Sequence, residues 1–165
     1  MPPATATIHA SAVLVGARAV LIRGPSGSGK SRLALELIEA ARYGALPFAR
    51  LVADDRVGLE AANGRLLVRP APPLSGLIEL RGIGILRLAH EPCAAIGLVV
   101  DLAAADAERL PQAENRTVEI FGIILPRLAV ASDSTGVLSS LLALRTSSGE
   151  AVADCWQDAV SPLDP

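Results

Sequence analysis

The sequence has few aromatic residues, few cysteines and little net charge. The aromatic side chains are those of Tyr43, Phe48, Phe121 and Trp156. They are too few to form base-stacking platforms, and a net charge of −2 does not provide the basic surface that non-specific nucleic-acid binding needs. Cys93 and Cys155 are far apart and belong to no CxxC pair or cysteine–histidine cluster, which argues against a zinc site or a disulfide framework. We therefore expect reduced thiols and no nucleic-acid partner.

Long hydrophobic segments are also missing. The longest apolar run extends from Cys93 to Val100, far short of a membrane span, and the N-terminus has no secretory-signal pattern. With 165 residues, 51% of them hydrophobic, the chain can bury one core and is not disordered. We expect one cytoplasmic domain over residues 1–165 and no membrane partner. Its core should span about 5–146, followed by a weakly patterned tail at 147–165.

Lysine is nearly absent, because fourteen of the fifteen basic residues are arginines and the single lysine is Lys30. The codon bias of a GC-rich genome explains an excess of arginine. It does not explain why one lysine remains, and the position of that lysine is informative.

The chain pattern predicts an α/β fold with a mixed sheet. A helical pattern begins at Ser31, continues to about Arg42 and is followed by Gly44 as a stop. A second helix is predicted at 135–145, with Asp133 or Ser134 as its N-cap. Strands are predicted near residues 5–9, 12–15, 19–22, 50–53, 57–59, 66–68, 77–80, 83–86, 95–102, 118–121 and 123–125. Because several of these form hairpins, we do not expect a doubly wound parallel sheet.

Turn and loop signals separate these strands. Asn63-Gly64 is a strong hairpin signal between two of them. Three prolines between Arg69 and Gly76 predict irregular backbone, and the Ala-rich residues 103–116 predict a loop or a short helix.

A phosphate-binding loop is the most specific motif. Gly24-Pro25-Ser26-Gly27-Ser28-Gly29-Lys30-Ser31 fits the pattern G-x-x-x-x-G-K-[ST] in full, after an apolar strand and before an amphipathic helix. Glycines let backbone N–H groups approach phosphates, and the helix N-terminus favours anions. Lys30 is suited to contact the β- and γ-phosphates, and the Ser31 hydroxyl to ligate Mg²⁺. The alternative is a Gly-rich turn without a ligand.

Two acidic residues, Asp54 and Asp55, follow the apolar strand Arg50–Ala53. A P-loop site needs a carboxylate near its metal ion, usually from a neighbouring strand. Adjacent strand residues point to opposite sides, so we expect one carboxylate at the metal and the other at the acceptor hydroxyl as general base. The alternative is an Asp pair that only begins a surface turn.

A second unusual stretch extends from Glu79 to Leu86. Glu79 and Arg81 share one face of an extended segment, where they could hold Mg²⁺ and phosphate oxygens respectively. Considered alone, a surface strand with a salt bridge explains this stretch as well. His9, a lone histidine upstream of the P-loop, is by itself more typical of a structural residue.

Taken in this order, these stretches resemble the catalytic domain of the HPr kinase/phosphorylase family, which acts on a serine of the phosphocarrier protein HPr. The matching segments are Ile8-His9, GPSGSGKS at 24–31, ALELIE in the helix, LVADDRV at 51–57 and LIELRGIGIL at 77–86, and they lie within residues 5–130. The resemblance implies a P-loop kinase core with a mixed β-sheet, similar to that shared by HPr kinase and PEP carboxykinase. It also implies ATP and Mg²⁺ as cofactors, HPr as the partner, and a homo-oligomer, most often a hexamer.

The resemblance assigns roles residue by residue. Lys30 and Ser31 match the family's phosphate and Mg²⁺ contacts, and Glu79 matches its signature Mg²⁺ ligand. Asp54 and Asp55 match its acidic pair. We favour Asp54 as the base and Asp55 as a metal ligand, while His9 would orient or tune the aspartate.

The chain also departs from the family pattern. Only eight residues precede His9, where the family usually has an N-terminal domain, and the segment 42–50 is longer than usual. The family's PxRPGRN-like loop is missing; Leu125-Pro126-Arg127-Leu128 is a faint counterpart. Arg127 is therefore the candidate phosphate-contacting arginine, with Arg116 as the alternative. Because the missing loop is linked to dephosphorylation, the resemblance does not extend firmly to the phosphorylase reaction. The short form is similar to alphaproteobacterial versions that regulate a phosphotransferase system.

Two other functions fit a P-loop. A small-molecule kinase or NTPase usually has an Arg-rich lid, for which residues 103–116 are a poor candidate. A non-catalytic nucleotide-sensing module would bind ATP without transferring phosphate.

Overall fold

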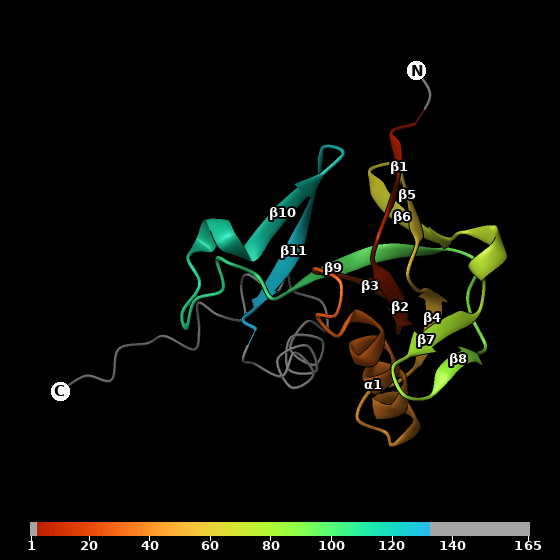
Figure 1. Ribbon diagram of the computed structural model, residues 1–165. Coiled ribbons are helices and arrows are strands. Elements are labelled where there is room, and N and C mark those ends of the chain that lie inside the picture. Colours follow the sequence, from red (N-terminus) through yellow and green to blue (C-terminus); the bar gives the residue numbers. More distant parts are fainter. Residues whose placement is uncertain (1–2, 133–165) are drawn as a thin grey trace.

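The structure is a computed structural model, and it describes residues 3–132. Within this part of the chain a large mixed sheet carries one α-helix (Figure 1). The helix is α1 (Lys30–Arg42), and the 3-10 helices are η1 (Pro72–Leu74) and η2 (Ala113–Arg116). The strands are β1 (Thr5–Ile8), β2 (Ser11–Val15), β3 (Arg18–Arg23), β4 (Ala49–Ala53), β5 (Val57–Ala62), β6 (Arg65–Pro70), β7 (Leu77–Leu80), β8 (Gly84–Arg87), β9 (Ala94–Leu102), β10 (Thr117–Ile120) and β11 (Ile123–Val130).

The large sheet has the strand order β1-β5-β6-β9-β3-β2-β4, and β11, paired with β10, joins it along β9. The pairs β3–β9 and β9–β11 are parallel, and the other pairs are antiparallel. The predicted α/β fold with a mixed sheet is thus confirmed. Because β3, β9 and β11 run parallel, their carboxyl ends meet at one edge, where the P-loop leaves β3.

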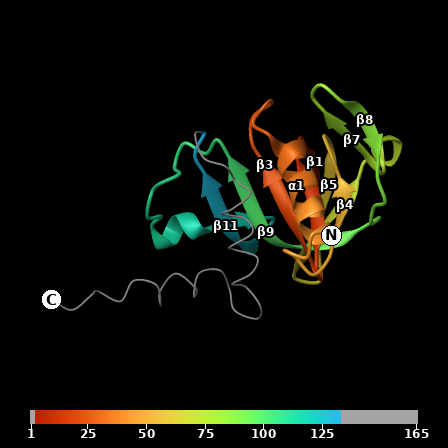
Figure 2. The ribbon, with the colours of Figure 1, turned by 90° about the horizontal axis from the view of Figure 1, so that it is seen from below.

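Hydrophobic cores cover both faces of this sheet. Leu33, Ala34 and Leu37 recur on one face of α1 and pack against alternate residues of β2, β3 and β9. The opposite face of the same strands packs against the β5–β6 hairpin through residues such as Leu59 and Leu66. Figure 2 shows α1 lying along the central strands, close to the edge that carries the P-loop.

The hairpins agree with the turn signals in the sequence. Asn63 and Gly64 both have positive φ between β5 and β6, as a tight hairpin turn requires. The expectation of irregular backbone was wrong for Arg69 and Pro70, which continue β6. Pro70 fits there because β6 pairs with β9 only at Leu67 and Val68, so no second neighbour needs its missing N–H.

Two hairpins stand apart from the centre of the sheet. In Figure 1 β10–β11 extends to one side, and the separate two-stranded sheet β7–β8 lies on the other side, next to α1. The loop predicted at 103–116 is present and ends in η2. The predicted helix at 135–145 lies outside the described residues. No helix in the described part is long and apolar enough to span a membrane.

Candidate active site

The P-loop connects β3 to α1, as predicted. Gly29 has φ 95°, a left-handed conformation that lets the chain turn sharply into the helix. Gly24 has φ 152°, and a Cβ there would stand 2.6 Å from Ser28 Oγ and 2.9 Å from the Leu102 carbonyl oxygen. Only glycine fits where the loop passes so close to the end of β9, so Gly24 fixes the loop against the sheet.

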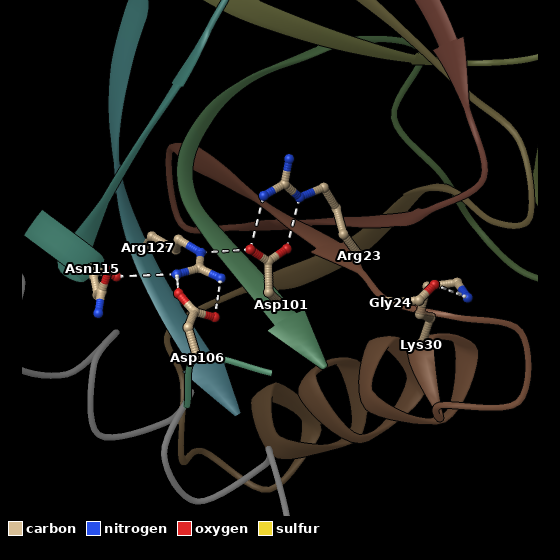
Figure 3. Close-up of polar contacts among 7 residues, drawn as sticks. All are labelled: Arg23, Gly24, Lys30, Asp101, Asp106, Asn115 and Arg127. Carbon is tan, nitrogen blue, oxygen red and sulfur yellow. Dashed lines mark hydrogen bonds and ion pairs between the residues drawn. The ribbon is translucent and has the colours of Figure 1, made fainter. Parts of the chain in front are cut away.

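Lys30, the single lysine, folds over this loop. Its Nζ donates hydrogen bonds to the carbonyl oxygens of Gly24 (2.9 Å) and Pro25 (3.0 Å), as Figure 3 shows for Gly24. Burial lowers the pKa of Lys30, and the charges of Asp54 and Asp55 partly oppose that effect. The ammonium thus lies at the mouth of the loop, between the backbone and the acidic pair.

Asp54 is buried, with 3% of its surface exposed, and accepts hydrogen bonds from three elements of the fold. Ser31 Oγ, on α1, donates to its carboxylate at 2.8 and 2.9 Å, and Ser11 Oγ, on β2, donates to Oδ1 at 2.5 Å. The backbone N–H of Glu79, on β7, donates to Oδ2 at 3.2 Å. The carboxylate is therefore held against the hydroxyl that the P-loop pattern assigns to Mg²⁺.

Asp55 points away from Asp54 and is exposed. Its carboxylate lies 3.1 Å from His9 Nδ1, and both side chains are more than half exposed. Asp55 has a positive φ of 65°, which is uncommon for a residue other than glycine and is typical of functional positions. The two aspartates thus have different surroundings, Asp54 buried against Ser31 and Asp55 exposed beside His9. Both lie beyond the end of β4, so strand alternation is not the reason for this difference.

One cleft of about 860 Å³ brings most of the predicted residues together. It is lined by His9, residues 26–33, Leu35, Glu36, Asp54, Asp55, residues 79–81, Ile83 and Leu102. Arg81 extends across it, with a guanidinium nitrogen 3.4 Å from the position of a Cβ built on Gly27. The cleft thus combines backbone N–H groups with the cations Lys30, Arg32 and Arg81 and several carboxylates, among them Asp54 and Asp55.

The donor set of this cleft fits Mg²⁺. The carboxylate of Asp54 and the hydroxyl of Ser31 are adjacent oxygen donors that could hold the ion, and Glu79 lines the same cleft. No group of three histidine, cysteine or acidic side chains arranged to hold a metal occurs among residues 3–132. Mg²⁺ commonly binds through one or two carboxylates together with substrate phosphates and water, so the set is adequate for it.

Arg127 and Arg116 do not line the cleft. Arg127 Nε donates to Asp101 at 2.6 Å, and its terminal nitrogens donate to Asp106 at 2.6 and 2.9 Å (Figure 3). Arg23 binds Asp101 from the other side at 2.7 and 2.8 Å. Arg116 donates to the carbonyl oxygen of Pro111 at 3.2 Å. Arg127, the arginine that the sequence suggested for phosphate contact, thus forms ion pairs with Asp101 and Asp106.

This network shifts the pKa values of Asp101, Asp106 and Arg127. Burial alone would raise the pKa of Asp101, but hydrogen bonds and charge from Arg23 and Arg127 outweigh it and hold the pKa below its ordinary value. The hydrogen bond from Arg127 lowers the pKa of Asp106. The pKa of Arg127 is raised, above all by its hydrogen bonds to Asp106. Asp101, Asp106 and Arg127 are therefore charged at neutral pH.

Sequence reasoning missed Ser11 and the Asp101 network. Ser11 is a fully buried hydroxyl in the otherwise apolar strand β2, two residues after His9. A buried polar residue needs a partner, and that principle could have directed attention to it. Asp101 gave a similar signal, as an acidic residue within the apolar strand β9.

The loop and sheet define a P-loop phosphate-binding domain with a mixed β-sheet. The model of the HPr Serine kinase C-terminal domain matches residues 3–144. The chain belongs to this family.

Curated relatives agree with this assignment. HPr kinase/phosphorylase from Geobacillus thermodenitrificans is 37% identical over 137 residues, covering 76% of this chain and 42% of that protein. HPr kinase/phosphorylase from Limosilactobacillus reuteri is 36% identical over 136 residues, covering 75% and 40%. The matched region thus spans about two fifths of the length of these relatives.

A solved structure is also similar. The Hpr(Ser) kinase/phosphatase from Coxiella burnetii superposes with a TM-score of 0.69 at 26% identity. The match covers 85% of this chain and 94% of that one. The likeness extends over nearly the whole of that chain, well beyond the P-loop segment.

Proposed function

We propose that this domain transfers a phosphoryl group from ATP to a serine hydroxyl of HPr. The observation that carries the proposal is the position of the exposed Asp55–His9 pair in the same cleft as Lys30 and Ser31. A phosphate-binding loop alone would suit any nucleotide-binding protein. A carboxylate that faces solvent across from that loop is where an incoming hydroxyl could lose its proton. Family membership supports a kinase and HPr as its acceptor.

The P-loop side of the cleft binds and orients the donor. Backbone N–H groups of the loop, Lys30 and Arg81 would contact phosphate oxygens, while Asp54 and Ser31 would hold Mg²⁺. Bound there, the ion would offset negative charge on the phosphates. Ser11 and the N–H of Glu79 keep the Asp54 carboxylate turned toward Ser31.

We propose Asp55 as the general base, which reverses the preference drawn from the sequence. The buried Asp54 already accepts hydrogen bonds at both carboxylate oxygens. Asp55 lines the cleft with an exposed side chain, and His9 is its ion-pair partner. His9 would orient the Asp55 carboxylate so that one oxygen remains available to the serine hydroxyl.

The rim of the cleft is suited to a protein acceptor. Ile83 and Ile85, at the tip of the β7–β8 hairpin, are 69% and 68% exposed, and Ile83 also lines the cleft. Neighbouring exposed isoleucines are typical of protein-binding surfaces. Because Ile83 lines the same cleft as Asp55, a protein bound over this hairpin could place a serine at Asp55, which supports HPr over a small metabolite.

The kinase direction is better supported than the reverse phosphorolysis. Arg127, the faint counterpart of the family's phosphorylase loop, is held by Asp101 and Asp106. We propose that it stabilises the domain and does not contact phosphate.

ADP release tests the proposal against the other functions. The chain, ATP and Mg²⁺ are incubated with and without HPr, and ADP is measured continuously. We expect HPr to stimulate release strongly and an HPr variant lacking the acceptor serine to have no effect. ADP release that HPr does not change but a metabolite stimulates would contradict the proposal. ATP binding without any turnover would contradict it as well.

A further inference from the structure

Arg32 is a cation of the cleft that the proposed chemistry does not use. It is the third residue of α1, directly after the phosphate-binding motif, and its side chain is 79% exposed. The positive end of the helix dipole lies at this first turn and disfavours a cation there. Lys30, in the same turn, is explained by the phosphates that the P-loop binds, whereas Arg32 is not part of that motif. Helix stability therefore does not account for an arginine at this position.

The ion pair between Arg32 and Glu36 does not account for the arginine either. Arg32 Nε lies 2.9 Å from Glu36 Oε1, one helical turn further along α1. In pairs with this spacing the favourable order has the acidic residue first, and here the arginine comes first. An exposed pair of this kind also contributes little to stability. The pair does hold the guanidinium beside the second turn of α1, and its two terminal nitrogens are not used by Glu36.

The catalytic cleft continues along α1 beyond the phosphate-binding loop. Glu36, which lines the cleft, follows Ser31 by five residues and lies about 7.5 Å further along the helix axis. The β7–β8 hairpin, next to α1 in Figure 1, forms the facing wall. We call this part the outer cleft; it is lined by the α1 residues Arg32, Leu35 and Glu36 and by the hairpin residues Leu80 and Ile83.

Arg81 and Arg32 serve different parts of the cleft. A guanidinium nitrogen of Arg81 comes within 3.4 Å of the Cβ position at Gly27, in the P-loop, so Arg81 can reach phosphates bound there. Arg32 is held by Glu36, on the turn of α1 that follows the P-loop end of the helix. Phosphates bound by the loop lie at the N-terminus of α1. The outer cleft therefore remains for the acceptor.

We infer that Arg32 binds a carboxylate of the acceptor protein, close to the serine that receives the phosphate. The inference rests on the proposed function in taking that acceptor to be HPr. An exposed guanidinium can bind a carboxylate through two parallel hydrogen bonds. Leu80 and Ile83 provide apolar contacts for the adjoining part of the acceptor. Arg32 is thus a specificity-determining residue, which favours acceptors with an acidic side chain beside the serine and takes no part in the transfer.

Charge reversal at Arg32 tests this contact. Arg32→Glu should raise KM for HPr by about tenfold at low ionic strength and leave kcat and ATP affinity unchanged. The increase should become smaller at high salt, because the contact is open to solvent. Arg42→Glu makes the same change at an exposed arginine on the last turn of α1, also paired with a glutamate, and should leave KM unchanged. An unchanged KM in Arg32→Glu, or a weaker ATP affinity, would overturn the inference.

Loss of structure and failure of the proposed function give different results. A glutamate suits the N-terminus of a helix and not its C-terminus, so the Arg42→Glu control is the variant with the greater risk of lost stability. A wild-type domain that binds HPr without phosphorylating it would contradict the proposed function alone. In that case the affinity for HPr, measured by titration calorimetry without ATP, should still fall by about tenfold in Arg32→Glu. A domain that phosphorylates HPr with the same KM in both forms would contradict the inference alone.

Compensating variants of HPr identify the carboxylate. Acidic residues of HPr are changed to lysine one at a time, and KM is measured with the wild-type domain and with Arg32→Glu. One HPr variant should be a poor substrate for the wild type and a good substrate for Arg32→Glu, because the two charges have been exchanged. If no HPr variant shows this exchange, HPr does not present a carboxylate to Arg32, and the inference is overturned.

Discussion

Lys30 shows at the scale of one residue how composition and structure together identify a functional position. Several of the arginines form ion pairs, such as that of Arg127 with Asp101, where a guanidinium serves well. At the P-loop a compact ammonium folds into the loop and bonds two backbone carbonyls. A planar guanidinium is larger and has a fixed fork of donors, so an arginine cannot replace Lys30 in the P-loop.

The first prediction concerns this lysine. Lys30→Arg keeps the charge and should still reduce phosphate transfer by about 100-fold, because the positioned cation is lost. Initial rates at saturating ATP measure the effect. Arg42→Lys, the reverse exchange on the exposed last turn of α1, serves as the matched control and should be silent. Full activity of the Lys30→Arg variant would show that phosphate transfer does not require the lysine.

The second prediction separates the two aspartates. Asp55→Asn should lower kcat by about 100-fold or more and leave the Mg²⁺ requirement unchanged, since it removes only the proton acceptor. Asp54→Asn should instead raise the Mg²⁺ concentration needed for half-maximal rate. Rates are measured across a Mg²⁺ titration for both variants. The opposite pattern would return the base to Asp54, as the sequence alone suggested.

Residue identities were predictable from the sequence, and their roles were less so. The P-loop pattern and the Asp pair stand out by spacing and lie in one cleft with His9 and Glu79. The inward position of Asp54 goes with its hydrogen bond from Ser11, 43 residues away in sequence, and with the positive φ of Asp55, neither of which the local pattern indicates. Arg127 was misleading because its partners Asp101 and Asp106 lie 26 and 21 residues away.

At the scale of elements, the β7–β8 hairpin carries a prediction about the acceptor. Ile83→Ser combined with Ile85→Ser should raise KM for HPr several-fold and leave ATP affinity unchanged, because the pair lies on the acceptor side of the P-loop. Such exposed substitutions should change stability by less than about 0.5 kcal/mol. Ile124→Ser alters an equally exposed isoleucine, 70% exposed on β11, and provides the control. Equal KM values in all three proteins would exclude the hairpin as the docking surface.

Strands and the first helix were largely predictable because local signals agreed with the tertiary fold. The Asn63-Gly64 turn and the P-loop helix are examples in which residue chemistry alone determines the element. The order of strands was not predictable, because β9 pairs with β3, β6 and β11, which are distant in sequence. Pairing over such distances depends on burial of both faces and leaves no local pattern.

At the scale of the whole molecule, the Arg23–Asp101–Arg127–Asp106 network ties the β10–β11 hairpin to the centre of the sheet. Asp101 and Arg127 are mostly buried, with side chains 12% and 13% exposed. Removal of one partner from a buried ion pair leaves the other uncompensated, which costs about 3–5 kcal/mol. Arg127→Met should therefore lower the free energy of unfolding by about 3 kcal/mol. Arg69→Met, which breaks the exposed pair with Glu60, should cost less than about 1 kcal/mol.

The same network predicts how stability depends on pH. Because the pKa values of Asp101 and Asp106 are lowered in the folded protein, their contribution is fully present above the unfolded value of about 3.9. It is lost as the pH falls further, through the folded values. Urea denaturation between about pH 2 and pH 7 should show a steep acid loss in the wild type and a shallower one in Arg127→Met. Equal slopes would contradict the assignment of Arg127 to a structural role.

The proposal that this domain phosphorylates a serine of HPr can be tested by measuring the intact mass of HPr. HPr is incubated with the domain, ATP and Mg²⁺, alongside a reaction with Lys30→Ala, and fragmentation locates any modification. We predict that HPr gains the mass of one phosphate on a serine with the wild-type domain and gains none with the variant. If HPr stays unmodified in both reactions although the wild-type domain binds ATP, the domain is not an HPr kinase.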